Sequence, residues 1–237
     1  MNYNDLSKAK NDFSAVPIRP AATVILLRDG EDGLETLLLR RNSKLAFAAG
    51  AWVFPGGRFE DVDFEAAGRT DEDSAAPFAA ARETLEETGL STAPESFVYY
   101  AHWTTPPGMP KRYATWFYMS ELRGDASVEV DGSEIHDHIW TTPANALAKH
   151  AALEIEIMPP TFVCLDELQG HNTVESALAY FNRRKVICYA PRFSKLDGVT
   201  VALYEGDAGY SDSDATQSGP KHRCLMEPGN WSYERTE

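Results

Sequence analysis

The sequence RETLEETGL fills residues 82–90 and follows the quartet FPGG at residues 54–57. Alanine-rich sequence leads into it from Ser74, a residue suited to capping a helix N-terminus, and Gly89 is suited to ending a helix. The pattern predicts a helix from Ser74 to Thr88. The acidic end of this helix is the part of the chain that most constrains fold and chemistry.

Three glutamates of the predicted helix share one face. Residues at i, i+3 and i+4 lie on the same side, so Glu83, Glu86 and Glu87 present their carboxylates together. They form either a solvated acidic face or a metal site. Their mutual repulsion, and their place near the negative end of the helix dipole, favour a bound cation. The opposite, buried side would comprise Phe78, Ala81, Leu85 and Thr88.

The chemistry of this acidic face favours hard cations. Carboxylate oxygens suit Mg²⁺, or Mn²⁺, better than zinc. The glycine pair of FPGG adds to the site, because backbone without a side chain can approach an ion or a phosphate closely. Helix and glycine loop together predict a metal site that acts on phosphate.

Working outward, apolar and β-branched runs predict a mixed α/β fold. Residues 21–27 and 36–41 form a predicted hairpin, and residues 97–104 and 113–120 form a second strand pair. Residues 55–73 read as a long loop. A strand end at 136–140 leads to a short helix at 143–150 that Thr142 caps. The C-terminal part predicts a helix at 172–184, strands at 186–189 and 199–204, and irregular structure beyond Asp207.

The bulk composition excludes several functional classes. The 237 residues carry a net charge of −14, which argues against nucleic-acid binding. No apolar run approaches the length of a membrane helix, and the N-terminus lacks a signal peptide. Three widely separated cysteines indicate a reducing, cytoplasmic setting. We expect an arm at residues 1–16, one domain with a helical extension at 17–206, and a tail at 207–237.

Residues 82–90, together with FPGG, resemble the signature of the Nudix hydrolase family. Its second half matches except at Thr84, where the family has an aliphatic residue. The first half departs further, since 18 residues instead of seven separate Asp63 from Arg82. We favour Asp63 as the upstream acid of the signature. The alternatives are Glu65, Asp71, Glu72 and Asp73.

The insertion is similar to one in the Nudix subgroup typified by the animal peroxisomal acyl-coenzyme A diphosphatase. The element before FPGG also looks like that subgroup, although it departs at Leu39, Asn42 and Ala46. The resemblance implies an α/β/α sandwich with a mixed sheet. It implies Mg²⁺-dependent hydrolysis of coenzyme A or acyl-coenzyme A. Cleavage of ADP-ribose or a dinucleotide, or nucleotide binding without cleavage by a sensor protein, are the alternatives.

The resemblance also implies roles for individual residues. The metal would be held by Glu83, Glu86, Glu87 and the carbonyl of Gly57. Glu83 and Glu86 are also catalytic candidates, and Arg82 would orient the cluster.

Further candidates lie outside the signature. Glu134 would serve as a general base or as an extra metal ligand, or would be an ordinary loop acid. Substrate phosphate would be bound by Arg40, Arg41 and Arg112, which could otherwise be exposed surface cations. The partner implied is a small nucleotide, with neither nucleic acid nor membrane, and the resemblance leaves room for a homodimer.

Aromatic residues flank the predicted strands and have two interpretations. They could stack a substrate adenine, or they could pack in the core, which is the more usual place for aromatic strand residues. The residues concerned are Trp103, Tyr113, Trp116 and Tyr118.

Overall fold

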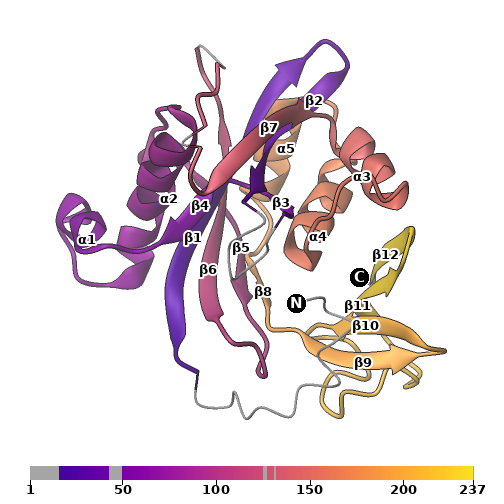
Figure 1. Ribbon diagram of the computed structural model, residues 1–237. Coiled ribbons are helices and arrows are strands. Elements are labelled where there is room, and N and C mark those ends of the chain that lie inside the picture. Colours follow the sequence, from indigo (N-terminus) through magenta and orange to yellow (C-terminus); the bar gives the residue numbers. More distant parts are fainter. Residues whose placement is uncertain (1–15, 43–49, 125–126, 131, 237) are drawn as a thin grey trace.

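The computed structural model describes residues 16–42, 50–124, 127–130 and 132–236 (Figure 1). The predicted N-terminal arm lies outside these residues except for Val16. Lys44 and Ala46, in the element before FPGG, are also outside them. Along the described part of the chain, no helix is long and apolar enough to cross a membrane.

The central sheet is built around the predicted hairpin. β1 (Ile18–Gly30) pairs antiparallel with β2 (Gly33–Arg41) and parallel with β6 (Arg112–Glu121), which pairs antiparallel with β5 (Val98–Thr104). Both predicted strand pairs are therefore confirmed. The strand order is β3-β2-β1-β6-β5-β8, with β4 on β1 and β7 on β2. The remaining bounds are β3 Trp52–Val53, β4 Gly56–Arg58, β7 Ile135–Thr141 and β8 Ile187–Tyr189.

Helices cover both faces of this sheet, as Figure 1 shows. Alternate side chains of β1 point to opposite faces. Val24 and Leu26 pack with the alanines of α2 (Glu72–Thr88), whereas Ile25 and Leu27 belong to the core that contains α4 (Pro159–Leu168) and α5 (Val174–Phe181). The predicted α/β/α sandwich with a mixed sheet is confirmed. Two further short elements are α3 (Pro143–Ala151), capped by Thr142 as predicted, and the 3₁₀ turn Pro94–Ser96.

The helix α2 differs from its prediction at its start and in its buried face. Asp71 rather than Ser74 is the N-cap, and it accepts a hydrogen bond from the Ser74 amide. Gly89 ends the helix with φ of 73°, as predicted. Leu85 is 49% exposed, so the predicted buried face is wrong at this position. The helix instead packs through small side chains and one acid, namely Ala75, Ala76, Ala79, Ala80, Thr84, Glu87 and Thr88.

The predicted loop between FPGG and α2 contains a helix, α1 (Asp61–Ala67). Its sequence has little apolar content, so periodicity gave no sign of it. Reciprocal capping bonds between Glu60 and Asp63 define its first turn, and Gly68 ends it in the left-handed conformation. The local capping chemistry replaces the missing apolar face.

The C-terminal part of the chain forms a second sheet. Its strands are β9 (Arg192–Leu196), β10 (Val199–Leu203), β11 (His222–Glu227) and β12 (Asn230–Arg235), all antiparallel. The prediction of an irregular tail is therefore wrong for residues 222–235. Ala202, Tyr204, Cys224 and Met226 of this part join the core that also contains α4 and α5. The domain boundary at residue 206 stays a prediction.

The strand predicted at residues 199–204 forms β10 of this sheet, and buried charge explains why β11 was not predicted. Arg223 is 1% exposed and donates through Nε and Nη2 to Asp207, at 2.7 and 2.6 Å. Asp207 also accepts from the amides of Gly209 and His222. A polar stretch can enter a core when its charges are paired in this way.

Candidate active site

Arg82 is the centre of the acidic cluster on α2. Its guanidinium donates to both oxygens of Asp63, at 3.0 and 3.1 Å. It also donates to Glu83 Oε1 at 3.2 Å and to Glu86 Oε2 at 3.0 Å. Burial alone would lower the Arg82 pKa, but its hydrogen bonds with Asp63 and the nearby acid charges raise it above the ordinary value. Arg82 therefore remains charged and fixes the position of two glutamates.

Asp63 is the one candidate for the upstream acid that reaches this cluster. It is 2% exposed, and both its oxygens accept from Arg82. Asp71 caps α2 and Asp73 accepts from the Trp116 indole at 2.8 Å, while Glu65 is exposed. Glu72 is exposed as well. The structure thus brings Asp63 to the α2 site as a partner of Arg82.

Glu87 is buried beneath the glycine loop. It is 6% exposed and accepts a hydrogen bond of 3.0 Å from the Gly56 amide. Burial raises the pKa of Glu87 to about 8, and the Gly56 bond offsets this shift only in part. The three glutamates share a helix face, as predicted, but Glu87 lies far deeper than the exposed Glu86.

The glycine pair is required by close contacts on both sides of β4. A Cβ on Gly56 would lie 2.2 Å from Thr23 Oγ1, and one on Gly57 would lie 2.3 Å from the Glu83 carboxylate. Burial is the main cause of a raised pKa at Glu83. Gly57 therefore leaves the space that the Glu83 carboxylate occupies, and its backbone lies against that carboxylate.

A cavity of about 870 Å³ opens beside Glu83 and Glu86. Its lining combines acids, cations and apolar side chains. The cations are Arg19, Arg41, Arg58, Lys111 and Arg112, and the acids are Glu60, Glu83, Glu86 and Glu134. Apolar lining comes from Val53, Phe54, Trp103, Phe117, Met158 and Phe193, among others.

The predicted residues outside α2 differ in whether they reach this cavity. Glu134 lies on its wall, and its Oε2 forms an ion pair with Nη2 of Arg41 at 3.4 Å. Arg112 also lines it and donates through Nε to the Thr105 carbonyl at 3.1 Å. Arg40, next to Arg41 on β2, is exposed and is not among the lining residues. The structure therefore brings together Glu134, Arg41 and Arg112 but leaves Arg40 outside.

The donor set at α2 fits a hard divalent cation. Glu83 and Glu87 carry raised pKa values because they are buried with too little positive charge, and a cation beside them would favour their ionised forms. Within the described residues, no three acidic, histidine or cysteine side chains already stand in ligand geometry. Arg82 spans Glu83 and Glu86. Carboxylates and the Gly57 carbonyl would supply the oxygen ligands that Mg²⁺ prefers.

The aromatic candidates divide between core and cavity. Trp116 and Tyr118 are 5% and 6% exposed and belong to the core beside α2, so they pack. Trp103 stacks on Tyr189 with ring centres 4.0 Å apart, and it also lines the cavity. Tyr113 also lines the cavity.

Sequence reasoning missed the cavity residues contributed by distant segments. Arg19 precedes β1's apolar run, Lys111 stands in the loop before β6, and Phe193 comes from the C-terminal sheet. Only the cluster of prolines and cations around Lys111 was a visible sign of a loop with a function. The contribution of Phe193 follows from a tertiary contact that no local pattern encodes.

Comparisons with known proteins identify the family and the fold that contain this site. The family model of the NUDIX domain matches residues 17–160. A curated relative, "Putative nudix hydrolase 7" of Caenorhabditis elegans, is 23% identical over 234 residues, covering 84% of this chain and 77% of that protein. The crystal structure of a NUDIX hydrolase from Alicyclobacillus acidocaldarius superposes with a TM-score of 0.64 at 24% identity. It covers 70% of this chain and 97% of its own, which shows a shared fold.

Proposed function

The chain belongs to the NUDIX domain family, and on that premise we propose that it is a Mg²⁺-dependent hydrolase of coenzyme A or acyl-coenzyme A. Nudix hydrolases generally cleave a pyrophosphate bond in nucleoside diphosphate derivatives and use divalent cations. This chain is such a hydrolase. The proposal concerns the metal, the substrate and the residues that act on it.

One observation carries the proposal: the α2 carboxylates open into a large cavity with a mixed lining. Coenzyme A combines a diphosphate, an adenosine and a long pantetheine arm, so it needs acids for metal, cations for phosphate and apolar surface for the arm. The 870 Å³ cavity offers all three. Its volume lies near the upper end of the range of about 300–1,000 Å³ that is usual for small-molecule sites.

The proposed metal ligands are Glu83, Glu86, Glu87 and the Gly57 carbonyl. A divalent cation bound there supplies charge neutralisation at the phosphate oxygens and activation of water. Arg82, anchored by Asp63, positions Glu83 and Glu86 for this task.

The remaining steps fall to residues of the cavity wall. Arg41 and Arg112 bind the diphosphate oxygens, since a guanidinium matches phosphate through forked hydrogen bonds. Water attacks one phosphorus, and the bond from that phosphorus to the bridging oxygen breaks with its electron pair going to the leaving phosphate. Glu134, 60% exposed at the cavity wall, accepts the proton of the water. The products are a phosphopantetheine and adenosine 3′,5′-bisphosphate.

Product identification tests this assignment. The protein is incubated with Mg²⁺ and one substrate at a time, and the products are identified by mass spectrometry. The substrates are coenzyme A, an acyl-coenzyme A, ADP-ribose, NADH and a diadenosine polyphosphate. We expect adenosine 3′,5′-bisphosphate from the two coenzyme A substrates, and at least about a hundredfold less of it in the same time with Glu86→Gln. The exposed Glu72→Gln at the start of α2 is the matched control and should cleave as wild type does.

Other outcomes of the panel would contradict parts of the proposal. Cleavage of ADP-ribose, NADH or the diadenosine polyphosphate, but not of coenzyme A, would replace the substrate and keep the reaction. Binding of these compounds without cleavage would replace the reaction by a sensing role.

A further inference from the structure

A second cavity, of about 860 Å³, lies between the C-terminal sheet and the loop that joins β5 to β6. Its lining includes three cations, Arg112, Arg192 and Lys195, together with hydroxyl side chains such as Thr105 and Ser194. Among the described residues that line it, none is acidic. The charge of this lining is opposite in sign to that of the chain, which has 36 acidic and 22 basic residues.

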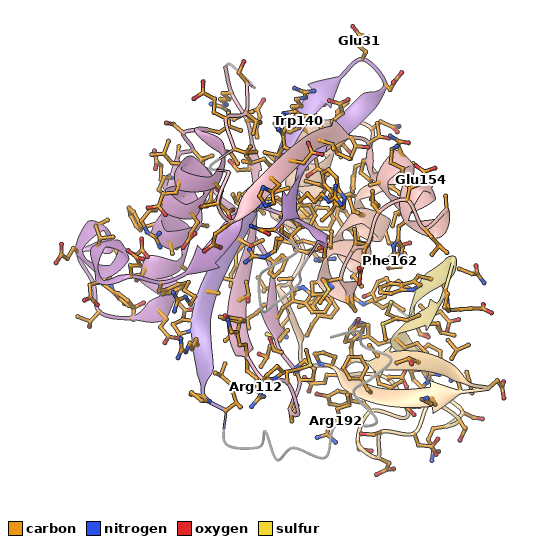
Figure 2. All side chains as sticks on the ribbon, in the orientation of Figure 1. Glu31, Arg112, Trp140, Glu154, Phe162 and Arg192 are labelled. Atoms are coloured by element: carbon orange, nitrogen blue, oxygen red, sulfur yellow. The ribbon has the colours of Figure 1, made fainter. Side chains whose placement is uncertain are left out.

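The second cavity continues the first. Six residues line both of them, namely Thr104, Thr105, Pro106, Arg112, Pro191 and Phe193. Arg112 begins β6 of the central sheet, whereas Arg192 begins β9 of the C-terminal sheet. Figure 2 shows both labelled arginines at the same end of the molecule. A ligand held at the α2 carboxylates can therefore extend past Arg112 into the cationic cavity.

The position of Arg192 is fixed from the side of the C-terminal loop. Its Nη1 donates to the Ser211 carbonyl at 2.7 Å, and its guanidinium lies 4.8 Å from the centre of the Tyr210 ring. These contacts hold the side chain before any ligand arrives, which lowers the entropic cost of binding. Lys195, also on β9, is exposed and supplies an ammonium group.

The two cavities differ in charge, so they would bind different parts of a long anionic ligand. The α2 end has an excess of carboxylates and needs a cation before it can hold phosphate. The C-terminal end has cations and no acid among its described lining residues, so it can bind a phosphate directly. The three cations make this cavity a locally positive region on a chain whose net charge is −14.

We propose that this cationic cavity binds a second phosphate of the substrate, a phosphomonoester remote from the scissile diphosphate. The inference rests on the proposed function and deepens it: the preferred substrates are diphosphates that carry a separate terminal phosphate. Arg192 and Lys195 would then be specificity-determining residues that the C-terminal sheet adds to the catalytic domain.

Kinetics on a matched substrate pair tests the proposal. Coenzyme A and 3′-dephospho-coenzyme A differ only in the terminal phosphate. With wild type, we expect the KM for coenzyme A to be about tenfold lower than that for the dephospho compound, as for a charge-assisted contact. Lys195→Gln and Arg192→Gln should remove this preference and leave kcat, and the KM for the dephospho compound, within about twofold.

The control variant is Lys185→Gln, at an exposed lysine that lines neither cavity. It should keep the wild-type preference. Equal effects of Lys195→Gln on both substrates, or no effect on either, would overturn the proposal. Lys195→Gln is the cleaner variant, because Arg192 also contacts the Ser211 carbonyl and its loss could loosen the loop.

Binding without turnover separates this inference from the proposed function. If neither substrate is cleaved, the proposed function fails, and calorimetry with adenosine 3′,5′-bisphosphate and AMP still decides the inference. Tighter binding of the bisphosphate by wild type, lost in Lys195→Gln, would support the cationic cavity as a phosphate site. Equal binding of the two nucleotides would overturn it.

Discussion

The three glutamates of α2 differ in burial, although they lie on one face of the same helix. Their spacing placed Glu83, Glu86 and Glu87 on one face, and the structure agrees. Their exposures nevertheless differ widely, at 18% and 56% for the Glu83 and Glu86 side chains and 6% for Glu87. Periodicity could not predict this, because the alanines of α2 let the helix approach the sheet and carry Glu87 beneath Gly56. Burial, rather than spacing, is the main cause of the raised pKa of Glu83 and of Glu87.

Glu87 makes the stability of the metal-free protein depend on pH. Its pKa rises from an ordinary 4.5 to about 8 on folding, so the folded state binds more protons than the unfolded state between these values. The free energy of unfolding should therefore fall as pH rises through this window. Urea unfolding in EDTA at pH 5 and pH 9 measures the fall, which should be smaller in Glu87→Gln by on the order of 4 kcal/mol. An identical fall in wild type and variant would show that Glu87 is ionised in the folded protein.

Gly57→Ala tests the close contact of the glycine loop with Glu83. The added Cβ would lie 2.3 Å from the Glu83 carboxylate, so that carboxylate must move. We expect kcat to fall at least about tenfold, since a misplaced ligand disturbs the reacting geometry. Gly170→Ala, where the nearest atom is 3.6 Å away, is the control and should keep its activity. Full activity of Gly57→Ala would remove Gly57 from the site.

At the scale of elements, α1 is the main feature that the structure shows and the sequence did not predict. The sequence of the insertion between FPGG and α2 predicts an acidic loop. In the structure it contains α1, and Asp63 in the first turn of α1 accepts hydrogen bonds from Arg82. The sequence indicated only that Asp63 stands where the Nudix-like signature has its upstream acid. It did not indicate that Asp63 lies in a helix. Capping bonds define the first turn of α1, and the ion pair of Asp63 with Arg82 joins α1 to α2. This explains why the hairpin and α2 were predictable and α1 was not.

Asp63→Asn should loosen α1 and disturb the cluster together. Asp63 is 2% exposed, and the neutral amide would remove the buried carboxylate that binds Arg82, leaving Arg82 with Glu83 and Glu86 as its partners. We expect the variant to lose on the order of 1–3 kcal/mol of stability. We expect a lower Tm and a lower kcat, because Arg82 also positions Glu83 and Glu86. Asp61→Asn, at an exposed residue of the same helix, should change neither. Unchanged stability in Asp63→Asn would mean that the ion pair does not hold α1.

At the scale of the whole molecule, the C-terminal sheet completes a cavity that the NUDIX domain begins. Phe193, Ala202 and the cations of β9 reach the cavities from a segment outside the matched residues 17–160. The sequence predicted β10 because its residues are β-branched and apolar, but a polar loop and a buried arginine concealed β11. Long-range contacts such as Asp207 with Arg223 cannot be read from local composition.

Asp207→Asn tests how this sheet is held. Removing the charge leaves Arg223 buried and unpaired, so unfolding should become easier by about 3 kcal/mol. Burial alone would raise the Asp207 pKa, but the Arg223 hydrogen bonds and two backbone amides lower it to about 2. The stabilisation is therefore present above the ordinary pKa of 3.8 and lost as pH falls towards 2.

Chemical unfolding at pH 7 and pH 3 measures this effect. The difference between wild type and Asp207→Asn should shrink at the lower pH, and the exposed Asp212→Asn should match wild type at both. A difference that does not change with pH would show that the charge of Asp207 is not what stabilises the sheet.

The central claim is that α2 holds a divalent cation that hydrolysis requires, and a Mg²⁺ titration of the rate tests it most directly. The protein is stripped with EDTA, and coenzyme A hydrolysis is followed as Mg²⁺ is returned to wild type, Glu86→Gln and Glu72→Gln. The account predicts no rate without metal, saturable recovery in wild type and Glu72→Gln, and a kcat at least about a hundredfold lower in Glu86→Gln. Hydrolysis that persists in EDTA, or equal rates in wild type and Glu86→Gln, would contradict it.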